Sequence, residues 1–330
     1  MSLRLATRVL PGDRDAIAAV ARVLESGGLA AFPTETVYGL GADATDGAAV
    51  ARLYDAKGRP HFNPLISHVA DLTAARGLAR FSPDAEVLAG VFWPGPLTLV
   101  LPKAARCPVS ELATAGLDSI AVRVPDHAMA RDILKAFGKP VVAPSANRSG
   151  HVSPTTAQHV RADLDGRIDL IVDGGATPVG VESTIVSCID APTLLRPGGV
   201  SRGAIERVLG HALGDIAPSA ATDADAPLAP GMLASHYAPH ARLRMDAESV
   251  EPGEALLAFG ATLPTHADRA ARTLNLSPGG DLVEAAALLF SHLRALDAAG
   301  VPSIAVMPIP HEGLGEAIND RLARAAAPRP

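Results

Sequence analysis

Short apolar segments joined by two kinds of connection constrain the fold of this chain more than any other feature. Segments 120–124 and 141–143 are separated by a helical pattern, whereas 184–189 and 193–196 are separated only by the turn Asp190-Ala191-Pro192. Helical crossovers join parallel strands, and tight turns join antiparallel strands. We therefore expect an α/β fold with a mixed sheet, less regular than a doubly wound one.

Hydrophobic periodicity gives the positions of the elements in the first two thirds of the chain. Strands are expected at 29–32, 65–69, 97–101, 120–124, 141–143, 168–172, 184–189 and 193–196. Helices are expected at 15–28, 46–57, 84–92, 127–137, 156–164 and 202–209. The 30 glycines and 28 prolines in 330 residues agree with a turn-rich chain rather than a coiled coil.

A change in composition divides the chain in two. Residues 214–240 are rich in Ala, Pro, Asp, Ser and Gly, which predicts a linker between a first domain at 1–213 and a second at 241–330. The second domain is expected to be a small open α/β unit. Its expected strands are 243–245, 255–259, 273–276 and 304–307, and its expected helices are 282–299 and 314–325.

The overall composition excludes several classes of protein. A net charge of −6 and an aromatic content of 3% argue against a protein that coats a duplex or stacks single-stranded bases. Only Cys107 and Cys188 are present, so a disulfide framework or zinc site is not expected. No apolar stretch approaches the ~18 residues of a membrane span, and we expect a soluble cytoplasmic protein without membrane contact.

The turn after the predicted helix 46–57 contains the first candidate ligand residues. Lys57 and Arg59 flank a glycine in this turn, and Asn63 and His68 follow before and within the next apolar strand. Two cations, an amide and an imidazole suit an anion. The alternative is that the two cations are solvated charges at the C-terminal end of a helix, where positive charge interacts favourably with the helix dipole.

Arg123 interrupts the apolar strand 120–124. An unpaired charge there would cost several kcal/mol, so this arginine requires an anionic partner. A structural Asp or Glu and a ligand carboxylate or phosphate are both open as that partner.

Two other patterns do not support a site. The run Gly39-Leu40-Gly41-Ala42-Asp43-Ala44 matches a dinucleotide fingerprint, but polar residues precede it where a strand is needed, and no Walker-type loop occurs. His236 and His240 have i, i+4 spacing, but Pro239 lies between them and makes a helical metal-binding pair unlikely. No residues are assigned to a protein-bound metal, and no covalent nucleophile is indicated.

Six segments in order resemble the threonylcarbamoyl-AMP synthase family, which is built on a YrdC-like domain. They are PTETVYGL from Pro33, KGRPHFNPLISHV from Lys57, WPGPLT from Trp93, PSANRSGHVSPT from Pro144, ESTIV from Glu182 and LRPGG from Leu195. The segment 229–239 resembles the linker of two-domain members. The resemblance implies a twisted mixed sheet with flanking helices around a cationic cavity, and a smaller Rossmann-like C-terminal domain.

The resemblance also implies an activity. Such enzymes condense L-threonine, bicarbonate or CO2, and ATP into threonylcarbamoyl-AMP and pyrophosphate, with Mg²⁺ entering on ATP. A separate complex then transfers the group to tRNA, so direct tRNA binding is not required. The expected ATP contacts are Lys57, Arg59, Asn63, Ser119, Ser145, Asn147, Ser153, Arg196 and Tyr237. Thr36, His68, Arg123 and Ser183 are expected to hold threonine, with the threonine carboxylate as the anion that Arg123 requires.

Within this family, Lys57 and Arg59 are expected to be catalytic by spreading phosphate charge, and the linker with Tyr237 is expected to close over the nucleotide as a lid. The main rival is an RNA-binding or ribosome-maturation factor that uses the same cationic cavity. Acidic net charge and scarce aromatics count against that rival. A carbamoyl-transfer domain for hydrogenase maturation is a third alternative, but the chain shows no zinc-finger or acylphosphatase-like segment.

Overall fold

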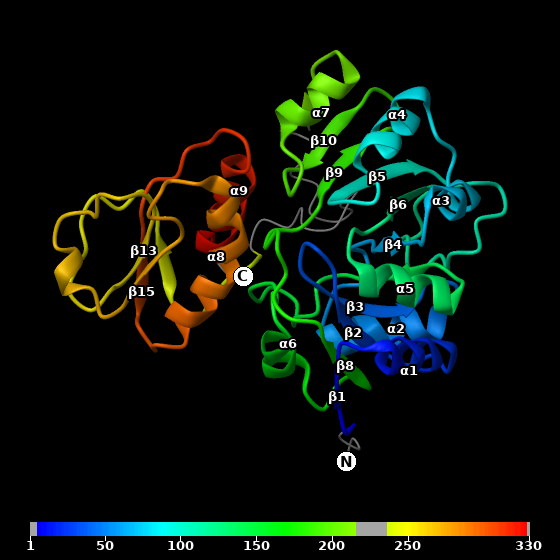
Figure 1. Ribbon diagram of the computed structural model, residues 1–330, viewed down its shortest axis with the longest axis horizontal. Helices are drawn as coiled ribbons and strands as arrows, with labels where there is room; N and C mark the ends of the chain where they lie inside the picture. Colours follow the sequence, from blue (N-terminus) through cyan, green and yellow to red (C-terminus); the bar gives the residue numbers. More distant parts are fainter. Residues whose placement is uncertain (1–4, 216–235, 329–330) are drawn as a thin grey trace.

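The computed structural model describes residues 5–215 and 236–328, which form two units side by side (Figure 1). The first contains an 11-stranded sheet in the order β1-β8-β2-β3-β7-β4-β6-β5-β9-β10-β11. The sheet contains both parallel pairs, such as β4–β6, and antiparallel pairs, such as β5–β6. The predicted mixed sheet is therefore confirmed. The predicted linker 214–240 falls largely on 216–235, outside the described residues.

The strands of the first unit are β1 (Arg8–Pro11), β2 (Ala30–Pro33), β3 (Tyr38–Asp43), β4 (Ile66–His68), β5 (Leu97–Pro102), β6 (Ser119–Arg123), β7 (Val141–Val142), β8 (Leu170–Asp173), β9 (Thr184–Ser187), β10 (Thr193–Arg196) and β11 (Gly214–Asp215). Its helices are α1 (Arg14–Glu25), α2 (Gly47–Lys57), α3 (Leu72–Leu78), α4 (Pro83–Phe92), α5 (Ala128–Phe137), α6 (Ala157–Leu164) and α7 (Arg202–Leu209).

Local capping explains where α2 begins and ends. Asp46 accepts a hydrogen bond from the amide of Ala48 at the helix start, and Gly58 adopts a left-handed conformation with φ of 60° at its end. Glycine takes this conformation without the steric penalty of a Cβ. The chain is thus turned sharply at Gly58, and the loop that carries Arg59 and Asn63 begins there.

The sequence prediction missed β3, which contains the Gly-x-Gly run. All six residues of β3 are buried. A Cβ on Gly41 would lie 2.7 Å from Cε1 of Phe32, and one on Gly39 would lie 3.1 Å from Cβ of Ala143. These glycines therefore permit close strand packing rather than binding a dinucleotide.

The second unit is a four-stranded parallel sheet in the order β12-β15-β13-β14, as expected for a small open α/β unit. Its elements are β12 (Arg242–Arg244), β13 (Ala255–Ala258), η1 (Ala267–Arg269), β14 (Thr273–Asn275), α8 (Leu282–Asp297), β15 (Ser303–Val306) and α9 (Gly315–Ala326). Figure 1 shows α8 and α9 between this sheet and the first unit. Both helices are therefore placed to contribute side chains to the interface.

The two units share a buried interface. Tyr237, Val37, Val152 and Val181 pack in one apolar cluster with residues of α8, including Phe290. The first sheet extends through β11 to Asp215, slightly beyond the expected domain end at residue 213. No helix in the part of the chain that the structure describes is long and apolar enough to cross a membrane.

Candidate active site

A cavity of about 50 Å³ lies at the interface of the two units. It is lined by all four residues expected to hold threonine, which are Thr36, His68, Arg123 and Ser183. It is also lined by four of the expected ATP contacts, Arg59, Ser145, Arg196 and Tyr237. Residues up to about 200 positions apart in the sequence are thus brought to one place by the sheet topology.

The sheet places His68 beside Arg123. These residues end the parallel strands β4 and β6, where they are direct register partners. Burial, reinforced by the charge of Arg123, lowers the pKa of His68 to about 3. His68 is therefore neutral at pH 7 and can contribute hydrogen bonds to a ligand but no positive charge.

Arg123 has a protein anion as its partner, which corrects the expectation that a substrate carboxylate supplies it. An oxygen of Glu35 lies 2.6 Å from a terminal nitrogen of Arg123, and both side chains are buried. Arg123 also donates to the Gly95 carbonyl at 3.2 Å and to Oγ1 of Thr36 at 3.0 Å. Arg123 thus uses one N–H group in each of these two hydrogen bonds, and N–H groups of both terminal nitrogens remain for a ligand.

Arg59 and Arg196 are buried cations on the cavity wall. Arg59 donates to the carbonyls of Asn63 and Pro64, and burial lowers its pKa to about 10. Arg196 donates to the Ser183 carbonyl at 2.8 Å and to the Ser183 hydroxyl at 3.3 Å. Arg196 therefore connects the residue expected to bind threonine with the side expected to bind ATP.

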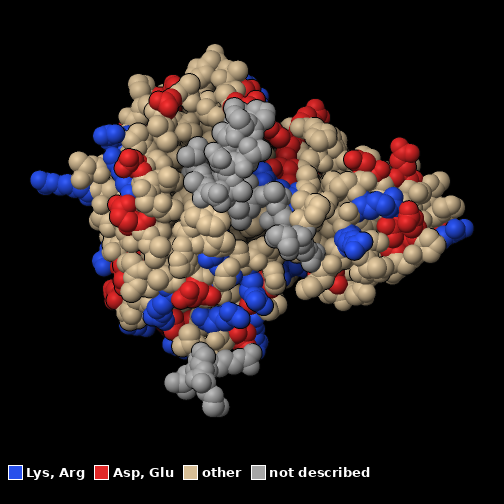
Figure 2. Space-filling model, turned by 180° about the vertical axis from the view of Figure 1, so that it is seen from behind, with Lys and Arg blue, Asp and Glu red and all other residues tan. Residues whose placement is uncertain are grey.

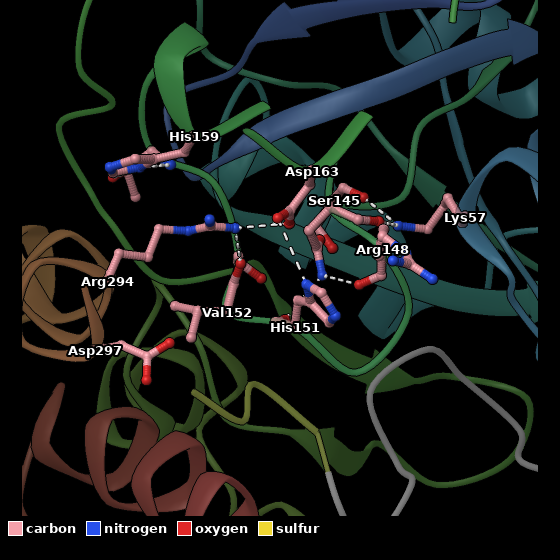
Figure 3. Close-up of polar contacts among 12 residues, drawn as sticks. Lys57, Ser145, Arg148, His151, Val152, His159, Asp163, Arg294 and Asp297 are labelled. Atoms are coloured by element: carbon pink, nitrogen blue, oxygen red, sulfur yellow. Dashed lines mark hydrogen bonds and ion pairs between the residues drawn. The ribbon is translucent and has the colours of Figure 1, made fainter. Parts of the chain in front are cut away.

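Lys57 does not line the cavity. Its amine donates to the carbonyls of Ser145 and Asn147, and Figure 3 shows the lysine directed at this loop. Burial, together with the nearby Arg59, lowers the pKa of Lys57 well below its ordinary value. In this conformation Lys57 holds the loop that carries Ser145.

Four other expected ATP contacts lie outside the cavity lining. Asn63 and Asn147 are buried, and the Asn147 side chain donates to the carbonyls of Arg148 and His151. Ser153 donates to an oxygen of Glu182 at 2.5 Å. Ser119 begins β6 at the end away from Arg123, on the same face of the strand by alternation. It therefore lies further along the face of the sheet that forms the cavity floor.

Two anions and a cation at the site, Glu35, Glu182 and Arg321, were not predicted from the sequence. Glu35 and Glu182 stand in quoted motifs, but carboxylates are usually exposed, and nothing local marks these as buried. Glu182 pairs with Arg321 of α9 at 2.7 Å. Arg321 falls on the buried face of α9 with Ile318 and Leu322, where it interrupts an apolar pattern as Arg123 does, and this signal in the sequence was overlooked.

Tyr237 has an unusual backbone and a tightly packed ring. Its φ of 61° is rare for an aromatic residue and costs about 1–3 kcal/mol unless the surroundings impose it. Its ring is stacked on Phe290, with centroids 5.5 Å apart and planes inclined by 24°. Backbone strain of this kind is often found at functional sites.

A second cavity of about 450 Å³ lies on the other side of His236, which lines both cavities. Figure 3 shows Asp163 between Arg294 of α8 and His151. Arg294 donates to Asp163 at 2.9 Å and to the Val152 carbonyl, which joins α8 to the loop before Ser153. Among residues 5–215 and 236–328, no group of three or more His, Cys, Asp or Glu side chains is arranged to hold a metal ion.

Surface charge on one face bears on the RNA-binding alternative. Figure 2 shows basic and acidic side chains interspersed over both lobes of that face. A protein that follows a nucleic-acid backbone usually gathers basic residues in a stripe or patch. The mixed pattern does not favour the alternative.

Comparisons with known proteins extend over nearly the whole chain. A family model described as "Telomere recombination" (Sua5, YciO and YrdC) matches residues 22–198, and one described as "Threonylcarbamoyl-AMP synthase, C-terminal domain" matches residues 200–327. The Bacillus subtilis threonylcarbamoyl-AMP synthase is 42% identical over 326 residues, covering 95% of this chain and 93% of the relative. The Pyrococcus abyssi threonylcarbamoyl-AMP synthase is 42% identical over 324 residues, covering 93% and 92%.

The structure is also similar to a solved one. The crystal structure of P. abyssi Sua5 complexed with L-threonine superposes with a TM-score of 0.88 at 39% identity, covering 97% of this chain and 98% of that chain. Both the arrangement of the two units and the sequence therefore correspond to those of these relatives.

Proposed function

The chain belongs to the threonylcarbamoyl-AMP synthase family, and we propose that it condenses L-threonine, bicarbonate or CO2, and ATP into threonylcarbamoyl-AMP and pyrophosphate. One observation carries the proposal: the residues expected to hold threonine and four expected ATP contacts line a single cavity. We call Thr36, His68, Arg123 and Ser183 the threonine end. We call Arg59, Ser145, Arg196 and Tyr237 the nucleotide end.

At the threonine end, Arg123 binds the amino acid carboxylate through its remaining N–H groups while the ion pair with Glu35 keeps the arginine in place. Neutral His68 and the hydroxyls of Thr36 and Ser183 are available to the amino acid's hydroxyl and amine. The Ser183 hydroxyl lies 2.7 Å from that of Thr98, which fixes its position.

The reaction then needs positioning and charge stabilisation more than a nucleophilic side chain. The threonine ammonium loses a proton to solvent, the free amine attacks CO2 to form the N–C bond, and loss of a second N–H proton to solvent gives the carbamate. A carbamate oxygen attacks the α-phosphorus of ATP, and pyrophosphate leaves as the bond to the β-phosphate oxygen breaks. Arg59 and Arg196 are buried cations that spread the developing phosphate charge, and Lys57 orients the loop that carries Ser145.

Magnesium enters with ATP as the MgATP substrate. Glu182 is the one carboxylate among the residues that line the described cavity, and it is already bound by Arg321 and Ser153. Phosphate oxygens and water are thus the expected ligands of Mg²⁺. The product passes to a complex that transfers the group to tRNA, a role consistent with a cytoplasmic location.

ATP binding must enlarge the cavity. Sites for ligands of this size usually measure roughly 300–1,000 Å³, whereas the cavity here measures about 50 Å³. His236 separates it from the second cavity of about 450 Å³, and the next residue is the strained Tyr237. Displacement of 236–238 would join the two spaces, which is how we propose that this segment acts as a lid.

Ser153 is proposed to contact the ribose rather than the phosphates. Its hydroxyl proton is already donated to Glu182, so its oxygen can accept but not donate a further hydrogen bond. Phosphate oxygens only accept, whereas ribose hydroxyls can donate. This assignment refines the expected ATP contact.

The proposal is tested by incubating the protein with MgATP, L-threonine and ¹³C-bicarbonate and identifying the product by mass spectrometry. We expect labelled threonylcarbamoyl-AMP and pyrophosphate, both dependent on threonine. Intact ATP, together with salt-sensitive RNA binding that needs neither ATP nor threonine, would instead support the RNA-binding alternative.

A further inference from the structure

We infer that Arg321 of the C-terminal unit is a positioning residue for ATP, because it neutralises Glu182 and orders the nucleotide end of the cavity. This inference rests on the proposed function. Arg321 is fully buried on α9 and contacts the cavity-lining residue Glu182, although it does not line the cavity itself. A buried arginine is costly unless its donors are satisfied.

The contacts of Arg321 are directed at the cavity wall. Its Nε donates to Glu182 at 2.7 Å, and one terminal nitrogen donates to the Pro197 carbonyl at 2.9 Å. The other terminal nitrogen donates to Asp320. Two of the three contacts thus hold Glu182, which precedes Ser183, and Pro197, which follows Arg196.

Two residues expected to contact ATP depend on this arrangement. The second oxygen of Glu182 accepts from Ser153, so Arg321 fixes Ser153 through one intervening side chain. The guanidinium also lies 5.2 Å from the centre of the Tyr237 ring, within the range of a cation–π contact. Arg321 is therefore one contact away from Ser153 and in direct contact with Tyr237.

Charge gives Arg321 its second role. Glu182 lines the cavity that must accept a triphosphate, and an uncompensated carboxylate there would repel the phosphates. Burial alone would raise the pKa of Glu182, but Arg321 and then Arg196 lower it, which keeps the carboxylate charged and paired. Loss of Arg321 would remove the ion-pair partner of Glu182 and leave its negative charge less compensated beside the nucleotide.

The test compares ATP and threonine dissociation constants and KM values for the full-length protein and four variants. Arg321→Met removes the charge, and we expect ATP affinity to fall by more than about tenfold while threonine affinity stays within about threefold. Arg321→Lys should recover part of the loss because it restores the charge without the planar fork. Arg321→Met combined with Glu182→Gln should return ATP affinity to within about threefold of the parent, since no unpaired carboxylate remains.

Arg202→Met is the matched control. Arg202 also joins the two units, through Glu316 at 3.0 Å, but its ion-pair partners do not line the cavity, whereas Glu182, the partner of Arg321, does. Equal loss of ATP and threonine affinity in Arg321→Met, with no recovery in the double variant, would overturn the inference in favour of general structural damage. An unchanged ATP affinity in Arg321→Met would overturn it as well.

Folding and the proposed function are judged separately. If Arg321→Met does not fold, the variant that combines Arg321→Met with Glu182→Gln tests the electrostatic role. A tenfold or greater loss of ATP affinity in that variant, once folded, contradicts the electrostatic role. A parent protein that makes no threonylcarbamoyl-AMP contradicts the proposed function. If the parent protein is active and Arg321→Met leaves its ATP affinity unchanged, only the inference about Arg321 is contradicted.

Discussion

The two ends of the cavity are built differently. All four residues of the threonine end belong to the first unit, and three of them stand at or beside strand ends of one sheet. The nucleotide end takes Tyr237 from beyond the domain junction, and Phe290 and Arg321 of the second unit support it. In the proposed function, one unit therefore holds the amino acid, whereas nucleotide binding depends on how the two units meet.

The largest effect is expected from breaking the threonine end at Arg123. Arg123→Met should lower kcat/KM for threonine by about a thousandfold or more, because it removes the carboxylate ligand and leaves Glu35 buried without its partner. Steady-state kinetics with threonine and ATP varied in turn measure the effect. The ATP dissociation constant should change little if the two ends are independent.

Stability must be separated from binding in that experiment. Breaking a buried ion pair costs about 3–5 kcal/mol, so Arg123→Met is compared with the double variant Glu35→Gln/Arg123→Met, which has no unpaired carboxylate. Recovered stability without recovered threonine binding would assign Arg123 a direct role. Normal threonine KM in the double variant would remove Arg123 from the threonine end.

A smaller effect, with the opposite selectivity, is expected at Phe290. Phe290→Ala removes the ring that stacks on Tyr237, so KM for ATP should rise about tenfold while KM for threonine stays close to that of the parent. Loss of a buried phenylalanine also costs about 3–5 kcal/mol of unfolding free energy, which denaturant titration measures. Phe290→Leu, which keeps most of the apolar volume, is the control. A rise in KM for threonine as large as that for ATP would show that the two ends are not supported separately.

Sequence periodicity was sufficient for most of the fold because apolar burial follows local pattern. Thus α7 agrees with the expected 202–209, and β10 with 193–196. It missed β3 because glycine is a poor strand residue by propensity, and the close approach of Phe32 and Ala143 that requires glycine is a tertiary feature. The short strand β1 and helix α3 were missed as well.

The candidate site was predictable where a charge interrupts an apolar strand, and not where the partner comes from elsewhere. Arg123 had to have an anion, but its partner Glu35 lies in another segment and carries no local mark of burial. Arg321 was missed because an arginine of an amphipathic helix is ordinarily expected to be exposed, although it falls among the buried residues Ile318, Leu322 and Ala325 on one face of α9. All four residues assigned to the threonine end from the sequence line one cavity, whereas Phe290 and Arg321, which support the nucleotide end, were not predicted.

The smallest effect is expected from acid, and it reports on the threonine end alone. The pKa of His68 is about 3 in the folded protein and about 6.5 in the unfolded chain, so the unfolded chain binds more protons between these values. Stability therefore falls as pH falls through this range and is unaffected by His68 above it.

His68→Gln removes this contribution. Between pH 7.5 and pH 5 the parent should lose about 2 kcal/mol more unfolding free energy than the variant, as measured by denaturant titration. His159 and His236, whose pKa values are also lowered by burial, are retained in both proteins and cancel in the difference. Equal losses in parent and variant would mean that His68 accepts a proton as readily when folded as when unfolded, and would place it outside the buried wall that Arg123 shares.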